Sequence, residues 1–428
     1  MVSPKLLESK STRATILGLL SVLLLAFAPH AFALSNGQAA NLVLGQANFI
    51  SNNTVATQTE LNLPNAVAFD SSGNLWVADQ NNNRVLEYKA PFSTHEAASL
   101  IIGQSSFTGS ASATSSTGLS GPTGLAFDSG GNLWVVDMGN SRVLEYATPF
   151  STGEAAASVI GQSSFTSSDF ADTNSTGLSY PTGLAFDSAG NLWVADQGND
   201  RVLEYKTPFS THEAASLVIG QPGFTTADTG ATTQTSLNGV KALAFDSSGN
   251  LWVVDFRQSR VLEYTTPFST HEAASLVIGQ ASFTSRDCAF TSTCAASSTN
   301  LFDPNALAFD SSGNLWVADG DNNRVLEYSA PFSTHEAASL VIGQPSFTGG
   351  AAATTSRGLS GPEGLAFDSG GNLWVADYAN SRVLQFGGSV TTTSTTPEFP
   401  SLAIPIIFTI VLAAATLLLG PARRLRHP

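Results

Sequence analysis

The chain has 428 residues, six tryptophans, two cysteines and a formal net charge of −15. A chain this acidic repels the phosphates of nucleic acids, so the composition speaks against a nucleic-acid partner. The length alone is typical of two or three domains, but internal repetition overrules that estimate.

The N-terminus has the order of a secretory signal. Basic residues at Lys5, Lys10 and Arg13 precede an apolar run over residues 16–28, and Ala31-Phe32-Ala33 follows. This order of basic, apolar and small residues predicts a helical signal peptide over residues 1–33, cleaved after Ala33. An uncleaved anchor helix is the alternative, although the apolar run is short for a bilayer span.

One repeat dominates residues 34–387. Its first copy contains Phe-Asp-Ser-Ser-Gly-Asn-Leu-Trp-Val-Ala-Asp at residues 69–79 and Asn-Arg-Val-Leu-Glu-Tyr at residues 83–88. Five more copies follow, and a fixed period of roughly 60 residues indicates a solenoid, propeller or array. Each copy contains one tryptophan: Trp76, Trp134, Trp193, Trp252, Trp316 and Trp374.

Each repeat predicts four β-strands. In the first copy we expect them over residues 66–69, 75–78, 84–88 and 99–104, separated by turn residues such as Asp, Ser, Gly and Asn. The strands are almost continuously apolar, which suits sheets covered on both faces. Four strands per unit, arranged radially, are typical of a β-propeller.

The N-terminal strand should close the ring. A Gly-Gln pair ends each fourth strand, and its first copy, at residues 42–46, precedes the first tryptophan. No copy follows the last tryptophan, so the sixth repeat ends at residues 382–386 with three strands of its own. The predicted fold class is therefore all-β: a six-bladed propeller with four strands per blade, closed by the strand at residues 42–46.

The repeat resembles the NHL family over roughly residues 42–387. The resemblance rests on the pattern Pro-x-Gly-Leu-Ala-Phe-Asp, Gly-Asn-Leu-Trp-Val-Ala-Asp and Asn-x-Arg-Val-Leu, which recurs six times with small variations. It implies a six-bladed NHL-type propeller but no single function, because functions are grafted onto such folds. Six-bladed relatives include amidating lyases and gluconolactonase-like hydrolases that use metals in the pore.

The C-terminus carries a linker and a membrane segment. Residues 388–400 are rich in Gly, Ser and Thr and end in a Pro-Glu-Phe motif, and residues 401–428 hold an apolar run followed by three arginines. The run is long enough for a transmembrane helix, and the arginines predict a cytoplasmic end. Motif, helix and basic tail resemble an archaeal PEF-CTERM sorting signal, which implies an archaeosortase-like processing enzyme. A plain membrane anchor is the alternative, and both predict a propeller outside the cell.

The cysteines and the histidines do not predict a metal site. Cys288 and Cys294 lie in one loop between repeats, and outside the cell they should form a disulfide. His95 recurs in three other repeats, and histidines on different blades lie too far apart to share a metal. We therefore predict no metal site and no cofactor.

Features present in every repeat are interpreted as architecture. The pair Asp79 and Arg84 recurs in all six repeats, and we expect it to fix turns at strand ends. The tryptophans should form the core between blades rather than a sugar-stacking platform. Ser93 and Glu96 have capping-box spacing, which predicts one helical turn before the outer strand.

Residues that break the repeat are the candidates for a ligand site. They lie at the start of the first strand or in the turn between the second and third strands, so they should meet at one mouth of the ring. Positive charge and aromatic surface among them favour an acidic or polar ligand, and neutral drift of surface loops is the alternative. The ligand-binding candidates are Lys241, Phe256, Arg257, Asp303, Asp321, Glu363 and Tyr378.

The sequence favours a cell-surface propeller that acts as a non-catalytic binding, adhesion or envelope-interaction module. Its partner would be a protein, a glycan or another envelope component. The alternatives are a purely structural envelope component and a metal-dependent enzyme of lyase or lactonase type. For a lactonase-type site, Asp303, Glu363, Asn65 and Asn305 would have to converge. No catalytic residue is assigned, because neither a nucleophile elbow nor a nucleophile–base pair is present.

The predicted processing of both ends can be tested on native protein. If the signal peptide and the sorting signal are removed, mass spectrometry of the protein from cell envelopes will recover neither residues 1–33 nor the segment after Pro397. Recovery of peptides from residues 423–428 in the bulk of the mature protein would leave the plain anchor as the explanation.

Overall fold

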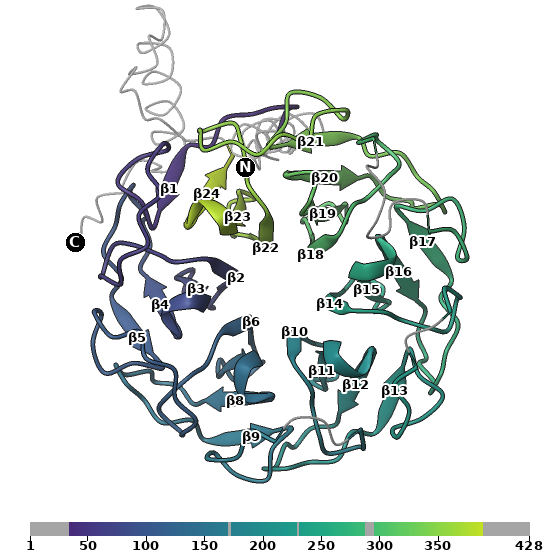
Figure 1. Cartoon of the computed structure of the whole chain (residues 1–428), viewed down its shortest axis with the longest axis horizontal. Helices are drawn as coiled ribbons and strands as arrows, with labels where there is room; N and C mark the ends of the chain where they lie inside the picture. Colours follow the sequence, from purple (N-terminus) through teal and green to yellow (C-terminus); the bar gives the residue numbers. More distant parts are fainter. Residues whose placement is uncertain (1–33, 170–172, 229–230, 287–294, 388–428) are drawn as a thin grey trace, which may run out of the picture. The chain divides into compact units, whose positions relative to one another are not determined.

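The computed structural model describes residues 34–169, 173–228, 231–286 and 295–387. This part of the chain is all β and forms six four-stranded antiparallel sheets, arranged radially around a central axis (Figure 1). Within these ranges no helix is long and apolar enough to cross a membrane. The predicted signal helix, linker, Pro-Glu-Phe motif and transmembrane helix lie outside the described residues, as do Cys288 and Cys294.

All six blades have the same strand order from the centre outward. The innermost strands are β2 (Pro64–Phe69), β6 (Pro122–Phe127), β10 (Pro181–Phe186), β14 (Val240–Phe245), β18 (Pro304–Phe309) and β22 (Pro362–Phe367). The second strands are β3 (Leu75–Asp79), β7 (Leu133–Asp137), β11 (Leu192–Asp196), β15 (Leu251–Asp255), β19 (Leu315–Asp319) and β23 (Leu373–Asp377). The third strands are β4 (Arg84–Tyr88), β8 (Arg142–Tyr146), β12 (Arg201–Tyr205), β16 (Arg260–Tyr264), β20 (Arg324–Tyr328) and β24 (Arg382–Phe386).

The outer strands are short. They are β5 (Leu100–Ile102), β9 (Ser158–Ile160), β13 (Leu217–Ile219), β17 (Leu276–Ile278), β21 (Leu340–Ile342) and, in blade six, β1 (Leu42–Leu44). Short 3-10 helices join the second and third strands of five blades: η1 (Gln80–Asn82), η2 (Met138–Asn140), η3 (Gln197–Asn199), η4 (Phe256–Gln258) and η5 (Tyr378–Asn380). In blade five the same connection is a turn.

The predicted ring closure is confirmed. Strand β1 pairs antiparallel with β24, with Leu42 opposite Gln385 and Leu44 opposite Val383. The N-terminal segment therefore supplies the fourth strand of the last blade. Because β1 pairs with β24, the third strand of this blade is not left as an exposed edge.

The N-terminal segment also supplies a turn that covers the neighbouring blade. The Gly37 N–H donates to the Val341 carbonyl of β21 at 2.9 Å, as the His95 N–H donates to the Val43 carbonyl of β1 at 3.0 Å. His212, His271 and His335 and Gly153 make the same bond in the other blades. Each of these turns thus protects an outer edge strand of the preceding blade from pairing with another chain.

This role corrects the expectation of a helical turn at Ser93. The Ser93 N–H does donate to the Glu96 carboxylate, at 2.8 Å, but the segment forms an isolated turn and no helix. The spacing that resembles a helix cap here stabilises a turn that docks on the next sheet.

The Phe-Asp-Ser-Ser-Gly-Asn-Leu-Trp motif stabilises a hairpin turn and also places a tryptophan in the core between two blades. The Asp70 carboxylate accepts hydrogen bonds from the Ser72 N–H at 2.9 Å and from the Trp76 indole N–H at 3.2 Å. The Trp76 ring is fully buried and packs edge-on against Phe127 and Phe150 of blade two, at centroid distances of 5.8 and 4.9 Å. This confirms that the tryptophans form the core between blades.

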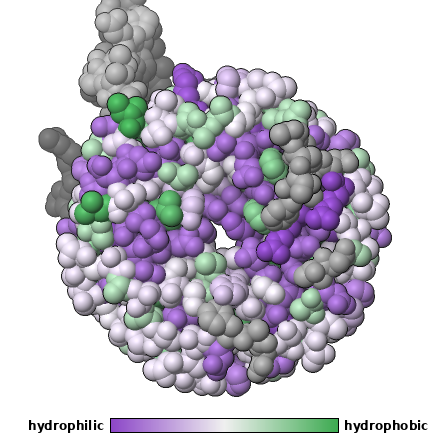
Figure 2. All heavy atoms as spheres, in the orientation of Figure 1, coloured by the Kyte–Doolittle hydropathy of each residue, from purple (hydrophilic) through white to green (hydrophobic). Residues whose placement is uncertain are grey.

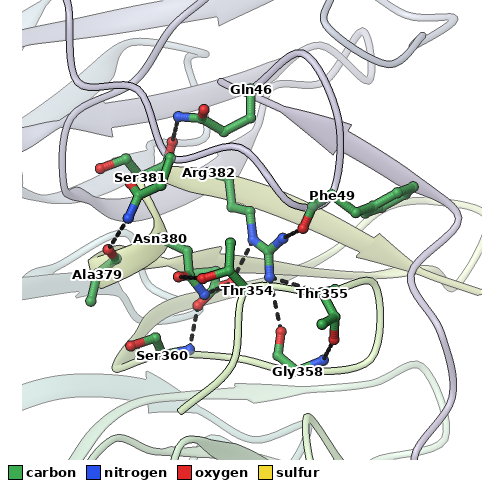
Figure 3. A network of polar contacts seen from close by, with 12 residues as sticks. Gln46, Phe49, Thr354, Thr355, Gly358, Ser360, Ala379, Asn380, Ser381 and Arg382 are labelled. Carbon is green, nitrogen blue, oxygen red and sulfur yellow. Dashed lines mark hydrogen bonds and ion pairs between the residues drawn. The ribbon is translucent and has the colours of Figure 1, made fainter.

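A buried arginine–aspartate pair anchors every blade, and Figure 3 shows the blade-six arginine, Arg382, with the loop residues around it. The Arg382 Nε donates to the Asp377 carboxylate at 2.7 Å, and both side chains are fully buried. The same guanidinium donates to the carbonyls of Thr355 and Gly358, each at 2.9 Å, and to the carbonyl of Phe49. The prediction that these pairs fix turns at strand ends is confirmed, and each arginine also fastens the two neighbouring interblade loops, the loops between an outer strand and the next innermost strand.

Substitution of Leu44 tests the contribution of ring closure to stability. Leu44 in β1 is 0% exposed, so Leu44→Asp places an unpaired carboxylate in the core and should lower the free energy of unfolding by at least about 3 kcal/mol. Ile50→Asp is the matched control, because Ile50 is 75% exposed in the loop after β1. It should change stability by no more than about 0.5 kcal/mol. Equal denaturation midpoints for the two variants would show that β1 is dispensable.

Candidate functional site

The innermost strands surround a cavity at the centre of the ring. Figure 2 shows the molecule hollowed there, with hydrophilic residues around the opening. The cavity has a volume of about 320 Å³ and is lined by residues of all six innermost strands and by residues of five turns between second and third strands. We call it the mouth cavity.

The residue after the first position of each innermost strand lines the mouth cavity. At this place the pairing register between the innermost and second strands shifts in every blade, as between Pro181 and Gly183. Such an irregularity frees the intervening residue from regular pairing and re-aims its side chain. The six residues are Asn65, Thr123, Thr182, Lys241, Asn305 and Glu363.

A second set of wall residues begins the 3-10 helices. The αL residue that ends each of these helices turns the chain sharply into the third strand. The first residue of the helix is thereby held above the innermost strand. The five residues are Gln80, Met138, Gln197, Phe256 and Tyr378.

Three charged or polar wall residues form one network across blades four to six. The Lys241 Nζ lies 2.8 and 3.1 Å from the two Glu363 carboxylate oxygens and 3.0 Å from Asn305 Oδ1. Lys241 and Glu363 are 18% and 13% exposed, so the pair is largely screened from water. The Phe256 ring centroid lies 5.1 Å from the same ammonium. The positive charge predicted to attract an anion is thus already neutralised within the wall.

The seven candidates from the sequence divide between the cavity and its surroundings. Lys241, Phe256, Glu363 and Tyr378 line the mouth cavity, whereas Arg257, Asp303 and Asp321 do not. Burial, and next the charge of Glu363, raise the pKa of the Tyr378 hydroxyl, which therefore stays protonated at neutral pH.

Asp303 and Asp321 lie beside each other in blade five. Their side chains are within hydrogen-bonding reach, and burial, followed by the Asp321 charge, raises the pKa of Asp303 to about 6. Asp303 Oδ1 is buried without a hydrogen-bond partner, while Asp321 is exposed. Arg257 is exposed on η4. Burial raises the pKa of Asp200, and the nearby Arg257 charge lowers it in part.

The candidate list from the sequence did not include the neutral half of the wall. Gln80, Met138 and Gln197, together with Asn65, Thr123 and Thr182, occupy blades one to three. They stand at the same repeat positions as Lys241 and Phe256, and this equivalence is the signal that could have found them. Charge and aromatic surface, the criteria for the candidate list, did not indicate them because their side chains are uncharged and not aromatic.

The described residues do not fit the metal site that some related propellers use. Among them, no group of three or more His, Cys, Asp or Glu side chains could hold a metal ion. Glu363 supplies a carboxylate to the cavity wall, but its two oxygens and Asn305 Oδ1 already surround the Lys241 ammonium.

Two family models match the repeats. The NHL repeat model matches residues 61–88 and 359–386. The Teneurin NHL domain model matches residues 96–329, which is more than half of the chain. The chain belongs to the NHL family of β-propellers. No curated protein matches this NHL propeller.

Solved propellers resemble the chain at low identity. A streptogramin B lyase is 14% identical over 78% of this chain and 95% of its own, with a TM-score of 0.43. A putative gluconolactonase is 13% identical over 82% and 98%, with a TM-score of 0.46. A protein of unknown function from Bacteroides thetaiotaomicron is 14% identical over 83% and 75%, with a TM-score of 0.49. These similarities assign no activity to the NHL propeller.

A double-mutant cycle tests the charge pair in the cavity wall. Lys241→Met leaves the Glu363 carboxylate half-buried without its counter-charge and should cost roughly 1–3 kcal/mol of unfolding free energy. Adding Glu363→Gln should recover part of that loss, giving a coupling energy of at least about 1 kcal/mol in chemical denaturation at neutral pH. Lys89→Met, at an exposed position, is the control and should be neutral. Additive effects of the two substitutions would show that the pair is not coupled.

Proposed function

We propose that this NHL propeller is a non-catalytic binding module and that the mouth cavity is its binding site. The observation that carries the proposal is the separation of constant and variable residues. Residues common to all repeats, such as Asp79, Arg84 and Trp76, are fully buried in the blades. Residues that differ between repeats line the mouth cavity. Because identical blades present equivalent positions, a ring can recognise an asymmetric ligand only through the residues that differ.

The proposal includes display outside the cell. The order of residues in 1–33 supports secretion, and the apolar run and arginines of residues 401–428 support attachment to the membrane with the propeller outside. The Pro-Glu-Phe motif supports processing by an archaeosortase-like enzyme. A protein, a glycan or another envelope component would then be the accessible partner.

The mouth cavity suits binding better than catalysis. The Lys241 ammonium donates to three oxygens of Glu363 and Asn305, so all three of its N–H donors are already used within the wall. Burial, followed by the Asp321 charge, raises the pKa of Asp303 to about 6, which would suit a general base, but Asp303 does not line the cavity.

Filling the mouth cavity tests the proposal. Gln80→Trp with Gln197→Trp places two bulky rings at wall positions, whereas Asn81→Trp adds one at the exposed neighbour of Gln80. The purified full-length protein and both variants are incubated with cell-envelope material from the producing cells, and the retained protein is measured after washing. We expect the parent and Asn81→Trp to be retained and the filled variant to be lost. Equal retention of all three would favour a purely structural role.

A further inference from the structure

The mouth cavity offers a ligand two unlike halves. On blades four to six the charged groups and the Asn305 amide are satisfied within the protein. The Lys241 ammonium is held by Glu363 and Asn305, and the Asn305 amide donates to the Pro362 carbonyl at 3.0 Å. A ligand would have to break these bonds to make new ones, so it gains little from this half.

On blades one to three the Thr123 and Thr182 hydroxyls donate to backbone carbonyls, but two glutamine side chains have hydrogen-bonding capacity to spare. The side-chain amide of Gln197 has no hydrogen-bond partner among the described residues, and it lines the cavity half-buried. Gln80 lines it in the same way, and its Oε1 accepts one long bond of 3.4 Å from Asn65. A primary amide both donates and accepts, so these two side chains can bond to a group that does the same.

The cavity also presents apolar surface to a ligand. Met138 of blade two lies between the turns that carry Gln80 and Gln197, and Phe256 and Tyr378 come from blades four and six. The Tyr378 side chain is half-buried, and its hydroxyl has no hydrogen-bond partner among the described residues. The wall therefore combines amides with aromatic rings.

The charge of the wall favours an uncharged ligand. Lys241 and Glu363 neutralise each other at 2.8 Å. An anion would enter a protein with a net charge of −15 and find the cavity's ammonium already occupied by Glu363. A cation would have to compete with that ammonium for the same oxygens.

From these contacts we infer that the mouth cavity binds an uncharged saccharide unit, the end of a neutral glycan. Sugar hydroxyls donate and accept together, as the amides of Gln80 and Gln197 do, and the C–H face of a sugar ring packs on aromatic rings such as Tyr378. A cavity of about 320 Å³ lies at the small end of ligand sites. This inference rests on the proposed function and narrows its ligand.

Matched sugars provide the direct test. Glucose, glucosamine and glucuronate share one ring and differ in charge, and galactose, mannose and N-acetylglucosamine extend the neutral set. Calorimetric titration of the purified full-length protein should give a dissociation constant on the order of millimolar or tighter for at least one neutral sugar. If glucose or N-acetylglucosamine binds, the charged analogues glucosamine and glucuronate should bind at least about tenfold more weakly.

Variants assign the binding to the cavity. Gln80→Ala with Gln197→Ala should weaken binding of that neutral sugar at least about tenfold, because two hydrogen bonds are lost. Asn81→Ala, at the exposed neighbour of Gln80, should bind as the parent does. Binding of no neutral sugar, tighter binding of a charged analogue, or undiminished binding by the double variant would each overturn the inference.

Treatment of the envelope material separates this inference from the proposed function. Periodate cleaves the vicinal diols of sugars, so it should abolish retention of the parent protein, whereas protease treatment of the envelopes should leave it intact. If retention survives periodate, is lost after protease and still requires an unfilled cavity, the protein is a binding module for a polypeptide and the saccharide inference is wrong. If retention never depends on the cavity, the proposed function itself fails.

Discussion

The buried arginine–aspartate pair is the interaction on which the propeller depends. In blade one, Arg84 donates to Asp79 and to the carbonyls of Thr57 and Glu60, while the other oxygen of Asp79 accepts the Asn62 N–H at 2.6 Å. Asn62 precedes the innermost strand, so the pair positions that strand as well as the loops. A buried charge pair is tolerable only when its hydrogen bonds are satisfied, and here the interblade loops supply the acceptors.

A ring of hydrogen bonds between blades holds the mouth in register. The residue that follows the 3-10 helix or turn of one blade accepts, through its side chain, the N–H that precedes the innermost strand of the next blade. Examples are Asn83 with Gly121 at 2.8 Å and Asn323 with Gly361 at 2.8 Å. The other four pairs are Ser141 with Tyr180, Asp200 with Gly239, Ser259 with Asp303 and Ser381 with Leu63. Because these bonds hold neighbouring blades together, the residues that line the mouth cavity can vary between repeats without destabilising the ring.

The sequence by itself determined the blades and their closure. The Asp70 turn, its link to Trp76 and the Asp79–Arg84 pair join residues close in the chain, so their chemistry repeats wherever the motif repeats. Counting the Gly-Gln pairs was enough to predict that β1 completes blade six, because a closed ring tolerates neither a missing nor an extra strand. The separation of constant from variable positions likewise indicated which residues surround the mouth.

Only the tertiary structure decided what the mouth can bind. Lys241 and Glu363 are 122 residues apart and belong to blades four and six, so their contact depends on the radius of the ring and on the bulge in each innermost strand. The sequence alone suggested a cation available to an anion, and the structure pairs that cation within the wall. The same geometry leaves Arg257, Asp303 and Asp321 outside the cavity and brings in Gln80 and Gln197. Charge can be read residue by residue, but its availability to a ligand depends on neighbours that only the closed ring brings together.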